Sequence, residues 1–140
     1  MQPANETPLH VQSVFYANPD HYPPMINSAA LFARHGISQK IFCRRYLRQW
    51  FPSQPAAYAA TTQVFRIEDK RQSSFANYAN FLRQVLKQAS SQADAFIGYD
   101  LHGFLPARLL AARYRKPLVY HSHDYVENGN QRASLSIFLL

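Results

Sequence analysis

The sequence predicts an α/β fold in which a doubly wound parallel sheet lies between two layers of helices. Short apolar runs and helical patterns follow each other in the order β, α, β, β, α, β, α, β. The stretch 93–124 fits a strand, a helix and a second strand into about thirty residues, the size of a βαβ unit. Polar, titratable residues follow both strands of this unit, and open parallel sheets bind ligands beyond the carboxyl ends of their strands.

Composition and length indicate one globular domain. The chain has 140 residues, of which 47% are apolar, so it can bury a core without disulfides. Its single cysteine, Cys43, excludes an internal disulfide and a thiolate metal cluster, and it fits a reducing, cytoplasmic compartment. No apolar run approaches the roughly twenty residues of a membrane span. Residues 1–8 are polar and predict a flexible arm, which leaves 9–140 as the domain.

The first half of the chain begins with a strand. Residues 10–16 are rich in β-branched and aromatic types, and the prolines of 18–24 predict a loop. A helix is expected over 25–35, because Pro24 suits a first helical turn and Gly36 a helix end. A second strand is expected over 39–43. The section 46–62 predicts an irregular connection with at most one short helix.

The second half alternates strands and helices. A third strand is expected over 63–67, and Ser73 or Ser74 can cap the next helix. That helix carries apolar side chains at helical spacing: Phe75, Tyr78, Ala79, Leu82, Leu86 and Ala89. A strand over 95–99 follows, then a helix over 105–115 with Pro106 in its first turn, then a strand over 118–121. The apolar run that ends the sequence suggests a fragment, or an end covered by another segment or partner.

The formal net charge is +7, and the basic residues are clustered. Two acid-free groups stand out: Arg34, Lys40, Arg44, Arg45 and Arg48, and then Arg108, Arg113, Arg115 and Lys116. Such groups can attract phosphates, anionic lipid or nucleic acid, or they can be solvated faces. No nucleic-acid-binding motif is present, so no nucleic acid partner is expected.

Candidate site residues follow the two strands of the βαβ unit. Asp100 and His102 come after the strand 95–99, where they can contact a ligand or cap the next helix. His121, His123 and Asp124 come at the end of the strand 118–121. His121 and His123 point the same way in an extended chain, so H-x-H-D could also ligate a metal, although a third protein ligand is missing.

Two further places carry polar side chains. Asp20, His21 and Tyr22 lie in the loop after the first strand and either line a binding site or form a plain surface turn. Arg44 and Arg45 follow the second strand, and they either face an anionic ligand or lie in a solvated exit loop.

Three strings carry a resemblance to a known family: VFYANPDHYPPMINSAALFARHG, YDLHGFLPA and KPLVYHSHD. In this order they resemble the amino-terminal domain of family 4 glycosyltransferases of GT-B architecture. The resemblance implies a Rossmann-like domain that holds the acceptor, facing a second domain that binds the nucleotide-sugar with an E-x7-E motif. No glutamate pair here has that spacing. We therefore expect 9–140 to be an amino-terminal domain that is incomplete at its carboxyl end.

The resemblance also implies roles for individual residues. His123 matches the family's histidine that contacts the transferred sugar and is the expected catalytic residue. The expected substrate-binding residues are His121, Asp124, Asp100, His102, Asp20, His21 and Tyr22. No metal and no cofactor are implied. Many family members have a glycine-rich turn after the first strand, but here residues 18–22 are Asn-Pro-Asp-His-Tyr, so a close approach of backbone to phosphate is not supported.

The expected function is the acceptor side of a retaining glycosyltransferase that moves a sugar from a nucleotide-sugar to an acceptor hydroxyl. The acceptor would be a sugar or a lipid-linked molecule, at a cytoplasmic site with possible peripheral membrane contact. The isolated chain should be inactive, because the donor-binding domain is absent. Three alternatives stay open: a stand-alone Rossmann-like binding or regulatory module with a partner chain, an H-x-H-D metal-dependent hydrolase, and a module that binds membrane or nucleic acid through its basic groups.

Overall fold

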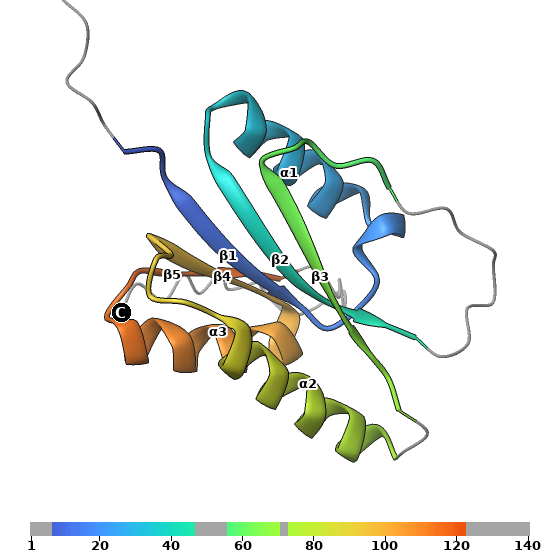
Figure 1. The fold of residues 1–140 in the computed structure, drawn as a ribbon. Helices are drawn as coiled ribbons and strands as arrows, with labels where there is room; N and C mark the ends of the chain where they lie inside the picture. Colours follow the sequence, from blue (N-terminus) through green and yellow to red (C-terminus); the bar gives the residue numbers. More distant parts are fainter. Residues whose placement is uncertain (1–6, 47–55, 71–72, 123–140) are drawn as a thin grey trace, which may run out of the picture.

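The computed structural model describes residues 7–46, 56–70 and 73–122. These form a five-stranded parallel sheet of order β3-β2-β1-β4-β5. In chain order the elements are β1 His10–Phe15, the 3-10 turn η1 Pro19–His21, α1 Pro23–Arg34, β2 Ser38–Arg45, β3 Thr62–Glu68, α2 Ser74–Gln88, β4 Ala95–Tyr99, α3 Asp100–Tyr114 and β5 Leu118–His121. Figure 1 shows α1 on one face of the sheet and α2 and α3 on the other. The predicted Rossmann-like α/β fold is confirmed.

The sheet is doubly wound about β1. The chain runs outward from β1 to β2 and β3, then returns through α2 to β4, on the other side of β1. Phe15 therefore pairs with Cys43 on one side and with Tyr99 on the other. The order of strands reverses between β1 and β4, and their carboxyl ends form the switch point at which such sheets bind ligands.

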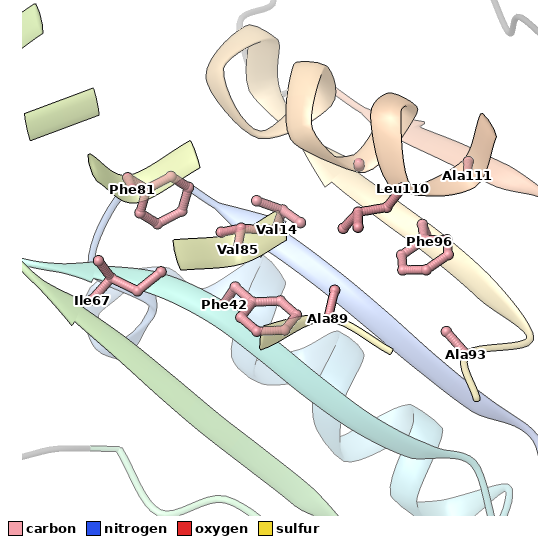
Figure 2. Packing of buried hydrophobic residues seen from close by; sticks show 11 residues of the cluster. Val14, Phe42, Ile67, Phe81, Val85, Ala89, Ala93, Phe96, Leu110 and Ala111 are labelled. Atoms are coloured by element: carbon pink, nitrogen blue, oxygen red, sulfur yellow. The ribbon is translucent and has the colours of Figure 1, made fainter. Parts of the chain in front are cut away.

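Two apolar cores cover the two faces of the sheet. The core under α2 and α3 includes Val14, Phe42, Phe81, Phe96 and Leu110, and Figure 2 shows these side chains meeting between the sheet and the two helices. The core under α1 combines two side chains of α1, Met25 and Ala29, with other side chains of the same strands: Val11, Phe15, Ile41, Cys43, Ile97 and Tyr99. Successive strand residues point to opposite faces, so β1, β2 and β4 each contribute to both cores.

The helix boundaries follow from local chemistry. Pro23 is at the first position of α1, and Gly36, at φ +70°, turns the chain after the helix ends. The Ser73 side chain accepts a hydrogen bond from the Ala76 N–H at 3.2 Å and so caps α2. The strands over 95–99 and 118–121 have their predicted bounds, whereas β2 and β3 are longer than predicted.

The predicted apolar face of α2 is partly wrong. Phe75 is 83% exposed and Ala79 is exposed, whereas Phe81 and Val85 are buried in the core. Phe81, Val85 and Ala89 recur every four residues and lie against the sheet, so the buried stripe is rotated from the predicted one. The first turn of α2 contributes no residue to the core.

The predicted start of the last helix is also wrong. Helix α3 begins at Asp100, immediately after β4, and not near residue 105. Two glycines permit this early start, because a Cβ at Gly98 would lie 2.7 Å from the Phe104 Cα and one at Gly103 would lie 2.3 Å from the Val14 carbonyl oxygen. Only glycine allows α3 to lie so close to both strands.

Because α3 starts early, Pro106 lies inside the helix and not in its first turn. Proline has no N–H, so the carbonyl of His102, four residues earlier, loses its helical donor. The Tyr78 hydroxyl of α2 donates to that carbonyl oxygen at 2.9 Å. A contact between two helices thus replaces one hydrogen bond within a helix. Among the described residues, no helix is long and apolar enough to cross a membrane.

Candidate functional site

The candidate site is the carboxyl edge of the sheet around the switch point between β1 and β4. His121 ends β5, Asp100 and His102 begin α3, and Asp20, His21 and Tyr22 lie in or directly after η1. All six therefore belong to elements that start or end at this edge. His123 and Asp124 lie outside the described residues, so their roles stay predictions.

On the α1 side, a row of rings crosses this edge. Tyr22 lies 5.2 Å from Phe15, Phe15 lies 5.8 Å from Tyr99, and Tyr99 lies 5.0 Å from His121, all measured between ring centroids. Register places Tyr99 opposite His121 on neighbouring strands. Burial raises the pKa of the Tyr99 hydroxyl, so it stays protonated at neutral pH. The row brings together Tyr22 and His121, two predicted site residues that are distant in sequence.

Asp100 is held in an unusual backbone conformation. Its φ is +54°, in the left-handed region, at the turn from β4 into α3. Aspartate tolerates this region better than most residues, but the conformation still costs about 1 kcal/mol or more. The N-cap position belongs to Tyr99, whose side chain makes no capping bond, so neither Asp100 nor His102 occupies it. His102 lies inside the helix, because the helix begins earlier than predicted.

On the side of α2 and α3, three ring side chains from three elements meet. The Tyr16 ring, directly after β1, lies 5.0 Å from the Tyr78 ring and 5.7 Å from the His102 imidazole. Tyr78 and His102 lie 5.3 Å apart, edge to face. We call Tyr16, Tyr78 and His102 the tyrosine–histidine surface. Tyr16 and Tyr78 are partly buried, and His102 is exposed.

Arg44 supports this surface from β2. Its guanidinium lies 4.5 Å from the centroid of the Tyr16 ring and 4.4 Å from that of Tyr46. Its Nε and Nη2 donate to the Asp69 carboxylate at 2.8–3.0 Å. Burial lowers the pKa of Arg44, but the hydrogen bond to Asp69 and then the charges of Tyr16, Asp69 and Tyr46 together raise it more, so the net shift is upward. Arg44 and Arg45 are residues of β2, so the exit-loop alternative is wrong for both.

A second ion pair anchors the loop after β1. One oxygen of the Asp20 carboxylate accepts from Arg66 at 2.9 Å and from the Tyr58 hydroxyl at 3.1 Å. The Asp20 side chain is only 5% exposed. Burial, followed by the charge of Asp20, raises the pKa of the Tyr58 hydroxyl. The loop that carries His21 and Tyr22 is thereby tied to β3, whereas His21 itself is exposed.

Sequence reasoning missed the tyrosines of this edge. Tyr16 and Tyr99 were assigned to strands and Tyr78 to a helix face, with no part in the site. The available signal was that Tyr16, Tyr99 and Tyr120 each stand at or next to the end of a strand, and that Tyr99 and Tyr120 directly precede Asp100 and His121. No three His, Cys, Asp or Glu side chains of the described residues could hold a metal ion together. The H-x-H-D alternative needs His123 and Asp124, so it stays untested.

Comparison with protein-family models gives no match, and comparison with curated proteins gives none either. Solved structures do match. One is the crystal structure of LpCGTa in complex with UDP, with a TM-score of 0.53 and 16% sequence identity over 82% of this chain.

That neighbour is a glycosyltransferase. This chain spans 30% of the neighbour's length. The similarity shows a shared Rossmann-like α/β fold. At this identity the comparison concerns the fold alone, and the arrangement of side chains described above belongs to this chain.

Proposed function

We propose that this chain is the acceptor-side, amino-terminal domain of a retaining glycosyltransferase that resembles family 4. The observation that carries the proposal is the switch point. There, Asp100, His102 and His121 lie along the carboxyl edge of a sheet whose fold is shared with a glycosyltransferase, with His121 on the α1 side and His102 on the side of α2 and α3. The strings YDLHGFLPA and KPLVYHSHD supply these residues and support the same assignment.

In the proposed reaction, the bond between the anomeric carbon and the phosphate oxygen of a nucleotide-sugar breaks. A new bond forms from that carbon to the acceptor hydroxyl oxygen on the same face, the hydroxyl loses its proton, and the nucleoside diphosphate leaves. This domain would hold the acceptor, with Asp100 and His121 as hydrogen-bonding groups. His123 would contact the transferred sugar and steady developing charge. A second domain would hold the departing phosphates, as the UDP complex of the neighbour suggests.

The test uses the complete product of the gene that encodes this chain, expressed and purified. It is assayed for release of nucleoside diphosphate from UDP-sugars when glycosides are offered as acceptors. We expect transfer, and we expect His123→Ala to lower kcat by about a hundredfold or more. His35→Ala is the matched control, since this exposed histidine at the end of α1 is not a site residue. A gene product with no transfer, or a His123→Ala variant with full kcat, would refute the proposal.

A second candidate function is a stand-alone module that acts with a partner chain, and one observation favours it. Leu101, Leu105 and Leu109 form a stripe along α3 and are 71%, 43% and 43% exposed. Leucines at this spacing commonly pack against another element. A second protein that co-purifies at a fixed ratio, and is lost from a Leu105→Asp variant, would favour the module over the transferase.

A further inference from the structure

We infer that the acceptor carries a neutral sugar ring, which stacks on the tyrosine–histidine surface. The inference rests on the proposed function and names the chemical class of its acceptor. It starts from an arrangement that the fold alone does not require: three ring side chains, from the residue after β1, from α2 and from α3, converge beside the switch point, and none of them is fully buried.

The His102 imidazole contacts both tyrosine rings and is still exposed to solvent. His102 meets Tyr78 edge to face, at 86°, and meets Tyr16 at a shallow 34°. Two of its neighbours are therefore aromatic, and part of the His102 side chain is left accessible to a ligand. An exposed ring face is negative at its centre, and the axial C–H groups of a pyranose carry partial positive charge, so the two attract each other.

The surface is also held in place before any ligand binds. The Tyr78 hydroxyl donates to the His102 carbonyl oxygen at 2.9 Å, which ties α2 to the first turn of α3. The Arg44 guanidinium lies on the Tyr16 ring and is fixed in turn by Asp69. These contacts restrict the Tyr16 and Tyr78 rings before a ligand binds, and such preorganisation favours affinity.

The two arginines that contact the site residues, Arg44 and Arg66, are already paired with carboxylates. Arg44, the arginine beside the surface, is bonded to Asp69 through two nitrogens. Arg66, the arginine beside the first loop, is bonded to the buried carboxylate of Asp20. Each guanidinium is matched by its own carboxylate, so neither offers a phosphate or a carboxylate ligand an unshared charge. The sequence had suggested that Arg44 faces an anionic acceptor; the ion pair argues against this.

The experiment is an NMR titration of the 140-residue chain with methyl β-D-glucopyranoside as the probe. Two other probes are compared with it: sorbitol has the hydroxyls without the ring, and glucose 6-phosphate has the ring with a negative charge. We expect the glucoside to bind at least threefold more tightly than either. In saturation-transfer NMR, we also expect the strongest transfer from the protein to the C–H protons of the glucoside ring.

Variants test the location. His102→Ala should weaken glucoside binding about three- to tenfold, the range for loss of one ring contact. Tyr78→Phe keeps the ring and should leave the affinity within about twofold. Phe75→Ala is the matched control, because it removes an exposed aromatic side chain of α2 that is no part of the surface. His102 is exposed, so its substitution should not unfold the chain.

Equal binding of sorbitol, tighter binding of glucose 6-phosphate, or unchanged affinity in His102→Ala would each overturn the inference. The two proposals can fail separately. Glucoside binding that needs His102, in a gene product without any transfer, would refute the transferase and keep the sugar-binding surface. Transfer whose acceptor KM is the same in His102→Ala and in the Phe75→Ala control would refute the surface and keep the transferase.

Discussion

The hydrogen bond from Tyr78 to His102 can be tested by a pair of substitutions. Pro106 lacks the N–H that would otherwise bond the His102 carbonyl within α3, and the Tyr78 hydroxyl replaces it at 2.9 Å. Tyr78→Phe removes the donor and leaves the ring contacts in place. The bond is partly accessible to water, so we expect a loss of about 1 kcal/mol in the free energy of unfolding.

Pro106→Ala restores an N–H four residues after His102. In that background the carbonyl has a helical donor, so Tyr78→Phe should cost less than about 0.5 kcal/mol. The effect of Pro106→Ala alone combines a gain in helix propensity with the loss of a buried ring, so the test uses only the difference between the two backgrounds.

Urea unfolding followed by circular dichroism measures all four proteins of this cycle. A loss of 1 kcal/mol should lower the midpoint by about 0.3–1 M urea and the Tm by about 3–4 °C. The slope of the transition should be the same in all four, since no substitution changes the surface exposed on unfolding. Equal costs of Tyr78→Phe in both backgrounds would refute the idea that the tyrosine replaces the missing N–H of the proline.

Three further predictions concern single sites. Gly103→Ala should lower the free energy of unfolding by about 3 kcal/mol or more, because its Cβ would lie 2.3 Å from a backbone oxygen of β1. Gly36→Ala meets no atom within 4 Å and should lower it by only about 1 kcal/mol, because of its positive φ; thermal unfolding of both variants checks this contrast. Burial raises the pKa of the Cys43 thiol to about 12 from 9.0. Between these two pH values only the unfolded chain ionises the thiol, so the free energy of unfolding falls as pH rises, by at most about 1.4 kcal/mol per pH unit. This contribution to the pH dependence should be absent in Cys43→Ala. Asp69→Asn should cost about 1 kcal/mol, because it removes the charge that Arg44 binds through two nitrogens; salt titration of the unfolding midpoint should show a weaker dependence in the variant.

Local sequence signals were sufficient for the order of elements, because each strand is a short apolar run between turn residues. The strands over 95–99 and 118–121 were predicted to the residue, and Ser73 was one of the two predicted caps. The start of α3 was missed for a physical reason. Proline in a first turn is the common case, and the close approach that Gly103 permits depends on β1, which is distant in sequence.

The sequence predicted where in the fold the candidate site lies, but not which side chains contact each other there. Parallel strands bring their carboxyl ends to one edge, so the polar residues after each strand could be gathered in advance. The ion pairs of this edge could not be predicted in the same way. The partners of Arg44 and Asp20 are Asp69 and Arg66, each more than twenty positions away; the register of β2 and β3 brings Asp69 near Arg44, and the turn after β1 brings Asp20 to Arg66.

The central position of β1 has a consequence for folding. β1 is synthesised first, but Asp94, which lies directly before β4 and bonds His10, is 84 positions later in the sequence. At about 5–20 residues per second, synthesis leaves the β4 side of β1 unpaired for about 4–17 s. Contacts of such long sequence separation also slow the folding of the finished chain. During this time the apolar faces of β1, β2 and β3 can contact other chains, and aggregation must be avoided until β4 is synthesised. A chaperone that binds nascent chains would act in this interval.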